Sequence, residues 1–87
     1  MDWETVEDKN KKIKKSFKFG GFKKAVSFVN KIAELAEKEN HHPDIYIFYD
    51  QVVVELWTHS VGGLSEKDFN LAAKIDEIFK ELSKSEL

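Results

Sequence analysis

The order of hydrophobic periodicities is the feature of this 87-residue sequence that most narrows its fold. Two short β-rich segments precede a helical pattern, and this order then repeats once. Residues 3–6 and 13–19 alternate partially between apolar and polar side chains, which indicates strands, and a polar stretch over residues 7–12 joins them. We therefore expect an opening antiparallel hairpin that ends at Gly20 and Gly21.

The next segment has the clearest helical spacing in the chain. Its apolar side chains recur every three or four residues and so fall on one face. They are Phe22, Ala25, Val26, Val29, Ile32, Ala33 and Ala36. Pro43 disfavours helical conformation in the residue before it, which places His42 outside the helix. The pattern predicts an amphipathic helix from residue 22, with His41 at its carboxyl end.

Two further β-rich runs follow, over residues 45–49 and 52–57, with Asp50 and Gln51 between them. This spacing predicts a two-residue hairpin turn, although the glycine that such turns favour is missing. Alternate side chains of the second run share a face, and the face expected in the core carries Val52, Val54, Leu56 and Thr58. The first run has apolar side chains on both faces, which predicts a contact between subunits.

A second helical pattern follows Ser65 and completes the fold. Its apolar members are Phe69, Ala72, Ala73, Ile75, Phe79 and Leu82. Asp68 lies three residues after Ser65, as in a capping box. The order strand, strand, helix, strand, strand, helix predicts an α+β fold, with a four-stranded antiparallel sheet and two helices on one face. We expect one domain over residues 1–87.

Composition narrows the classes of function. Fourteen basic against sixteen acidic residues give a net charge of −2, so no strong positive field is available to bind a phosphate backbone. Cysteine is absent, which excludes disulfides and thiolate metal clusters. The amino terminus is charged, and no stretch approaches the ~18 apolar residues that span a bilayer. We expect a cytoplasmic protein that binds neither nucleic acid nor membranes.

The three histidines, His41, His42 and His59, each lie at or beside the end of an expected element. Imidazole both donates and accepts protons at neutral pH, so such a cluster can divide acid and base roles. Glu37 precedes His41 by about one helical turn, where its carboxylate can orient the ring. The alternatives are a solvent-exposed turn and a zinc site. Zinc is disfavoured because the short-spaced ligand pairs of structural sites are missing.

These residues and their spacing resemble the pterin-4a-carbinolamine dehydratase family. The motif E-x-x-x-H-H-P runs from Glu37 to Pro43, and T-H-x-x-G-G-L-[ST]-x-x-D runs from Thr58 to Asp68. The resemblance extends upstream through Phe17, Phe19, Phe22, Ala25, Phe28 and Ala36, and more loosely to Trp3. It covers nearly the whole chain and implies the α+β layout expected above.

The resemblance implies a hydro-lyase that dehydrates 4a-hydroxytetrahydrobiopterin to quinonoid dihydropterin and water, a reaction of tetrahydrobiopterin recycling. No metal or organic cofactor is implied. By position, His41 and His59 would be the catalytic acid/base pair, and His42 would bind and orient the pterin. The full set of implied substrate-binding positions is His42, Glu37, Asp68 and Pro43, of which Glu37 and Asp68 would hold imidazole rings in the useful tautomer and orientation.

The family resemblance also implies partners. Its subunits join their sheets as dimers or as tetramers built from two dimers, and vertebrate members bind a homeodomain transcription factor. A protein-interaction module, or a relative that binds a pterin without catalysis, is therefore the alternative reading. The chain departs from the family pattern at Ile45, where many members carry an aromatic residue, and at Trp57, where the family position is usually small or polar.

Overall fold

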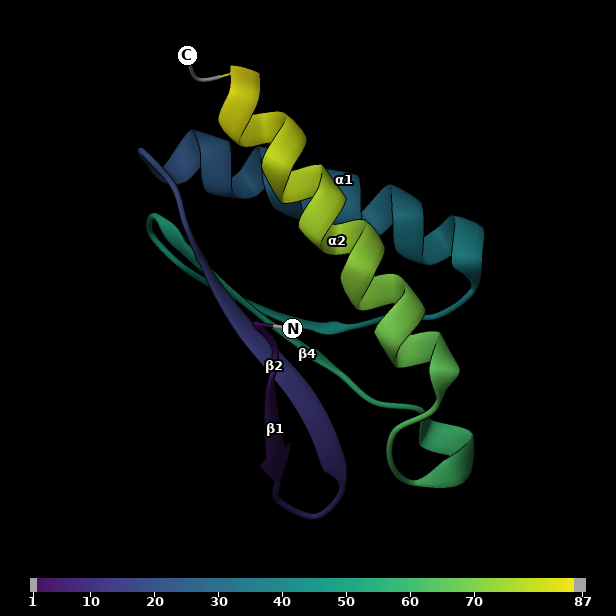
Figure 1. Cartoon of the computed structure of the whole chain (residues 1–87). Coiled ribbons are helices and arrows are strands. Elements are labelled where there is room, and N and C mark those ends of the chain that lie inside the picture. Colours follow the sequence, from purple (N-terminus) through teal and green to yellow (C-terminus); the bar gives the residue numbers. More distant parts are fainter. Residues whose placement is uncertain (1, 86–87) are drawn as a thin grey trace.

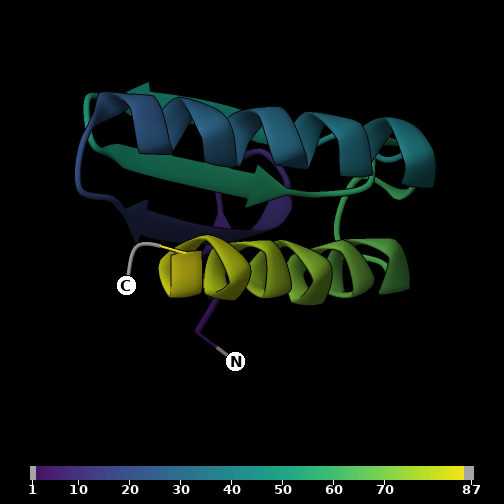
Figure 2. The ribbon, with the colours of Figure 1, turned by 90° about the horizontal axis from the view of Figure 1, so that it is seen from above.

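The computed structural model describes residues 2–85, and the elements follow one another in the order that the sequence predicts. They are β1 (Glu4–Glu7), β2 (Lys11–Lys18), α1 (Phe22–Glu39), β3 (Asp44–Phe48), β4 (Gln51–Leu56), the short 3-10 helix η1 (His59–Val61) and α2 (Glu66–Ser85). The strands form one open antiparallel sheet in the order β1-β2-β4-β3. The two helices lie on one face of this sheet and run in opposite directions (Figures 1 and 2), which confirms the expected α+β class. No helix within residues 2–85 is long and apolar enough to cross a membrane.

The core lies between the helices and the central strands β2 and β4. Paired residues of neighbouring strands point to the same face, so one set of side chains faces the helices. The buried members of this set are Ile13, Phe17, Val52, Val54 and Leu56. Phe17 packs against Phe28 of α1, with ring centroids 4.8 Å apart, and against Phe79 of α2, at 5.1 Å. Aromatic rings therefore fill much of the space between the sheet and the helices.

The buried face of each helix differs in part from the one that the sequence pattern predicts. α1 buries Ala25, Phe28, Ile32 and Ala36. Phe28 and Leu71 lie outside the periodic sets given above, yet both are buried. Phe22 and Phe69 belong to those sets but are 53% and 42% exposed. Phe22 is the first residue of α1, where the ring stacks on Tyr49 at the surface instead of entering the core.

The turn between β3 and β4 consists of Tyr49 and Asp50, flanked by the paired residues Phe48 and Gln51. The sequence predicted a two-residue turn correctly but placed it one residue too late. Tyr49 has a φ of 56°, in the left-handed region that glycine normally supplies in such turns. A tyrosine gives no sequence signal for this conformation, which explains the error.

Replacing Tyr49 with glycine should stabilise the protein. A left-handed conformation costs a residue with a Cβ roughly 1–2 kcal/mol, and glycine avoids this cost. Glycine loses more chain entropy on folding, however, which offsets about half of the stabilisation. Because the tyrosine is 68% exposed, its loss removes little burial, and the stacking on Phe22 that is also lost is a surface contact with centroids 6.4 Å apart. We expect Tyr49→Gly to raise the free energy of unfolding in urea by about 0.5 kcal/mol. Tyr46→Gly, within β3, should instead destabilise, and an equal loss in both variants would contradict the assignment of strain to Tyr49.

Helix α1 ends immediately before Asn40, which adopts the left-handed conformation with φ 53° and ψ 42°. The backbone N–H groups of Asn40 and His41 both donate to the carbonyl oxygen of Ala36, which closes the helix end. His42 lies outside the helix as expected. His41 also lies outside it, so its placement on the last turn was wrong. Asparagine tolerates left-handed geometry and ends the helix before Pro43 can do so.

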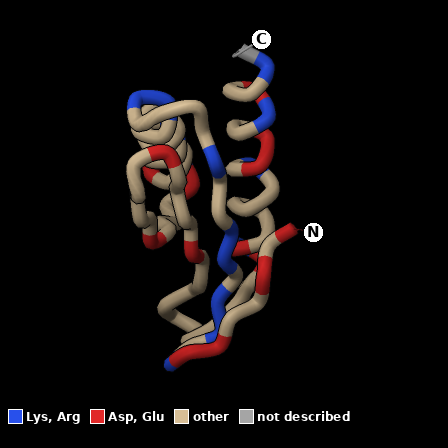
Figure 3. The backbone as a smooth tube through the Cα atoms, turned by 90° about the vertical axis from the view of Figure 1, so that its left-hand side faces the viewer, with Lys and Arg blue, Asp and Glu red and all other residues tan. Residues whose placement is uncertain are grey.

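Acidic neighbours pair with several of the lysines of β2. Lys15 Nζ lies 2.8 Å from the carboxylate of Asp76, and Lys18 Nζ lies 3.1 Å from that of Asp50. Figure 3 shows basic positions recurring along this strand, with acidic positions on adjoining segments. Much of the positive charge of β2 is therefore neutralised locally.

Candidate active site

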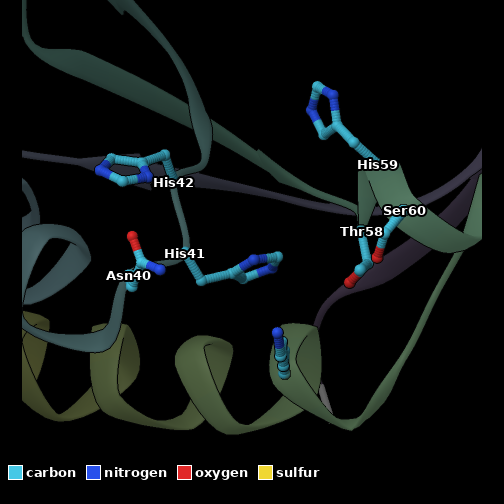
Figure 4. A pocket seen from close by; sticks show the side chains of 7 residues that line it. Asn40, His41, His42, Thr58, His59 and Ser60 are labelled. Atoms are coloured by element: carbon cyan, nitrogen blue, oxygen red, sulfur yellow. The ribbon is translucent and has the colours of Figure 1, made fainter.

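The three histidines line one pocket at the end of the sheet where β3 begins and β4 ends. Asp44 at the start of β3 pairs with Glu55 near the end of β4, so residues 41–43 just before β3 and residues 57–59 just after β4 lie at the same end of the sheet. The pocket has a volume of about 360 Å³ and is lined by Asn40, His41, His42, Thr58, His59, Ser60 and Lys67. Figure 4 shows the three imidazole rings around one open space. Strand pairing therefore joins two motifs that lie far apart in the sequence.

A buried carboxylate holds His41. Asp68 is fully buried, and its Oδ1 lies 2.7 Å from Nε2 of His41. Its Oδ2 accepts hydrogen bonds from the hydroxyl of Thr58, at 2.8 Å, and from the backbone N–H of Ser65, at 3.0 Å. With Nε2 donating to Asp68, a neutral His41 ring carries its free lone pair on Nδ1. The carboxylate therefore fixes both the orientation and the tautomer of this ring.

The same carboxylate caps helix α2. The backbone N–H of Ser65 donates to Asp68, which confirms one half of the capping box expected from the sequence. The other half is absent, because the Ser65 hydroxyl lies 2.7 Å from the hydroxyl of Thr58. The backbone N–H of Asp68 donates instead to the backbone carbonyl of Ser65, at 3.1 Å. Asp68 therefore joins the helix start to the histidine pocket.

Glu37 orients His42, not His41. Its carboxylate lies 2.5 Å from Nε2 of His42, and both side chains are exposed, at 78% and 56% respectively. The expected contact with His41 was wrong because α1 ends before that residue, so the one-turn spacing does not apply. Neighbouring histidines thus meet separate carboxylates, one exposed and one buried.

His59 has a different environment. Its ring stacks on the indole of Trp57, with centroids 3.9 Å apart and an interplanar angle of 21°. The loop that carries it is closed by Thr58 and Gly63, whose backbone groups form two hydrogen bonds of 2.7 and 3.3 Å. Gly62 makes this closure possible, because it has a φ of 64°. The loop that displays His59 is therefore locally fixed.

The structure extends the set of site residues given by the sequence. The additional residues that line the pocket are Asn40, Thr58, Ser60 and Lys67. The predicted residues Glu37, Asp68 and Pro43 are not in the lining: the first two contact histidines from outside it. Trp57 is not among the predicted site residues, although an odd-numbered position in the run 52–57 puts it on the side opposite to the core-facing set, which is also the side of His59. Within residues 2–85, no group of three or more His, Cys, Asp or Glu side chains is arranged to hold a metal ion.

Residues 1–78 match the sequence profile of the family described as pterin 4 alpha carbinolamine dehydratase. The chain belongs to this family. A family member from Saccharolobus islandicus is 50% identical over 78 residues, which cover 90% of this chain and 78% of that protein. A member from Sulfolobus acidocaldarius is 54% identical over 69 residues, which cover 79% and 76%. Both are named "Putative pterin-4-alpha-carbinolamine dehydratase".

Solved structures share the fold. A transcriptional coactivator/pterin dehydratase from Brucella melitensis superposes with a TM-score of 0.82 at 39% identity, covering 88% of this chain and 81% of that one. A pterin dehydratase-like protein, described as a RuBisCO assembly factor in the alpha-carboxysome, gives a TM-score of 0.77 at 22% identity, covering 91% and 90%. The second likeness concerns the fold alone. The dehydratase fold thus occurs in proteins to which different functions are assigned.

Proposed function

We propose that the histidine pocket catalyses the dehydration of 4a-hydroxytetrahydrobiopterin to quinonoid dihydropterin and water. One observation carries this proposal: His41, fixed by the buried Asp68, lines the same pocket as His59. The volume of about 360 Å³ also lies within the usual range for small-molecule sites, roughly 300–1,000 Å³. Membership of the dehydratase family supports the choice of substrate.

The reaction requires two proton transfers at neighbouring atoms. The bond between C4a and the hydroxyl oxygen breaks, and that oxygen takes up a proton and leaves as water. The proton on N5 is removed as the double bond between C4a and N5 forms. A protonated imidazole and a neutral imidazole supply both steps, and they exchange protonation states in doing so. We assign these two roles to His41 and His59 as a pair.

The other residues of the pocket would bind the pterin. His42 lies at the exposed edge, where Glu37 holds its ring at 2.5 Å. From there it can hydrogen-bond the polar edge of a planar heterocycle. The hydroxyl of Ser60 and the ammonium of Lys67 also line the pocket and offer further polar contacts. These groups would hold C4a and N5 in place while the two imidazoles exchange protons.

The direct test follows the absorbance of 4a-hydroxytetrahydropterin as it decays in the presence and absence of the protein. We expect a catalytic amount of protein to accelerate this decay well beyond the rate in buffer. A decay rate equal to that in buffer would refute the enzymatic proposal. If the protein bound a reduced pterin without turnover, the non-catalytic pterin-binding alternative would stand. Capture of a partner protein by a variant lacking all three histidines would instead support the interaction module.

We also propose that two copies associate through strand β3, in an assembly that is either a dimer or a pair of such dimers. This strand is an edge of the open sheet, and its side chains Tyr46, Ile47 and Phe48 are 45%, 38% and 59% exposed. An apolar edge strand can pair with the same strand of a second copy across a two-fold axis, which extends the sheet.

The mass in solution tests this assembly. Light scattering should give the mass of two or four chains for the wild type. Phe48→Lys should lower this mass, because a charged side chain would then replace an apolar one on the pairing strand. Val61→Lys is the matched control: Val61 is equally exposed, at 62%, but lies in η1, and its variant should keep the wild-type mass. A wild-type protein with the mass of one chain would contradict the association.

A further inference from the structure

The ring of His59 lacks the restraint that its two neighbours have. His41 contacts a carboxylate oxygen at 2.7 Å, and His42 contacts another at 2.5 Å. Within the described part of the chain, no group hydrogen-bonds the imidazole nitrogens of His59. The His59 ring instead stacks on the indole of Trp57, with ring centroids 3.9 Å apart and an interplanar angle of 21°. An aromatic contact therefore takes the place of a carboxylate.

The indole is itself held in place. Its Nε1 donates to a carboxylate oxygen of Asp44, at 3.4 Å, and Nζ of Lys12 lies 5.8 Å from its ring centroid. Lys12 in turn pairs with Glu55, at 3.5 Å. These contacts come from β2, β3 and β4, so three strands support the position of one ring. The indole of Trp57 is therefore fixed in position, and the His59 ring packs against it.

The position of Trp57 in the sheet separates it from the core. Val54 and Leu56 face the helices and are fully buried, so alternation directs Glu55 and Trp57 to the helix-free face. The indole is only partly buried and does not belong to the hydrophobic core. Removing it should therefore leave the fold intact, which allows its local role to be tested.

Stacking suits a residue that must both give and take protons. Hydrogen bonds of an imidazole lie in the plane of its ring, whereas a stacked neighbour occupies only a face. A carboxylate partner uses one ring nitrogen, as Asp68 does at His41. Contact with an indole fixes the plane of the ring and leaves both nitrogens available. It also removes rotamers that an exposed histidine would otherwise sample, so the ring is oriented before substrate arrives.

From this geometry we propose that Trp57 is a positioning residue, which orients the His59 imidazole at the pocket by face-to-face stacking. The catalytic consequence rests on the proposed dehydratase function. The contact itself does not, because it exists in the free protein. Its effect on turnover should pass through His59 and not through direct contact with the pterin.

Nuclear magnetic resonance of the free protein tests the contact. The ring current of Trp57 should shift the Hδ2 and Hε1 signals of His59 upfield. Trp57→Leu should abolish this shift, and Trp57→Phe should keep part of it. The ring signals of His41 and His42 serve as internal controls and should not move. Unchanged His59 signals in Trp57→Leu would overturn the proposal.

Steady-state kinetics on the 87-residue protein test the positioning role. Trp57→Leu should lower kcat about tenfold with little change in KM, since orientation of a reacting group is lost, and Trp57→Phe should restore most of the rate. In a His59→Gln background the same Trp57→Leu change should have no further effect, because the group through which it acts is gone. An equal loss in both backgrounds would show that Trp57 contacts the substrate directly and would overturn the proposal.

The two readouts separate this proposal from the proposed function. If the wild type does not accelerate dehydration but Trp57→Leu abolishes the His59 shift, the dehydratase function fails and the orientation of His59 by Trp57 stands. If the wild type is active but Trp57→Leu leaves kcat unchanged, the dehydratase function stands and the positioning role fails.

Discussion

Replacing His41 and His59 together with glutamine should remove nearly all dehydratase activity while the protein remains folded. Each imidazole is expected to transfer one proton, and general acid or base catalysis typically contributes about 10²–10⁴-fold to a rate. We expect the double variant to lose at least about 10³-fold in kcat. Glutamine keeps an amide that can donate to Asp68, so the buried carboxylate retains a partner. The decay of 4a-hydroxytetrahydropterin gives the rate, and thermal unfolding confirms the fold.

The single variants sharpen this expectation. If the two histidines act in one concerted step, each single replacement should cost nearly as much as both, because effects within one catalytic unit are not additive. His42→Gln is the matched control from the same cluster. We expect it mainly to raise KM, since its proposed role is to bind the pterin. Full turnover in the double variant would show that the two imidazoles do not carry the chemistry.

Asp68→Ala should damage both stability and turnover. The fully buried carboxylate accepts bonds from Thr58 and from the backbone of Ser65, and it contacts His41. Alanine leaves these groups without their partner, and each unsatisfied buried polar group costs about 1–3 kcal/mol. We expect the free energy of unfolding, measured in urea, to fall by about 3 kcal/mol. The rate should fall as well, because His41 loses its orientation.

Asp68→Asn separates the two roles of this carboxylate. Its amide oxygen can still accept from Thr58 and Ser65, whereas its NH₂ group now faces Nε2 of His41 and favours the opposite tautomer. We expect a loss of stability of only about 1 kcal/mol. Turnover should nevertheless fall about 10²-fold, a cost comparable to that of replacing other residues that orient a reacting imidazole.

Asp76→Asn is the control for a carboxylate on the same helix. Asp76 contacts Lys15 at 2.8 Å and lies outside the histidine pocket, so its variant should keep full activity. If Asp68→Asn also kept full activity, Asp68 would be a helix cap without a part in catalysis. Equal losses of activity in both variants would point to a general effect on the fold.

The element order could be predicted from the sequence because each element buries one face. Val52, Val54, Leu56 and Thr58 alternate along the chain, and all four are buried in the structure. The ends of helices and the positions of turns were harder to predict. Asn40 ends α1 through a left-handed conformation, and Tyr49 adopts a positive φ that its side chain does not favour. Neither feature has a periodic signal.

The site was predictable as a set of residues but not as a network. The spacing of two motifs grouped the three histidines, and strand pairing brings them to one pocket. The resemblance implied that Glu37 and Asp68 hold imidazole rings, but which ring each carboxylate contacts could not be predicted from the spacing. Asp68 is 27 residues from His41 in sequence, and no helical spacing relates them. Trp57 did have a signal, since alternation placed it beside His59, but a large ring on a strand also suits a subunit interface.

A crystal structure with an unreactive reduced-pterin analogue bound tests the central claim most directly. We expect the analogue in the pocket between residues 40–42 and 58–60, with a ring nitrogen of His41 and one of His59 each within hydrogen-bond distance of the reacting atoms. One should reach the substituent on C4a and the other should reach N5. An analogue bound on another surface, or bound in the pocket with C4a and N5 beyond the reach of both imidazoles, would contradict the assignment of dehydration to this site.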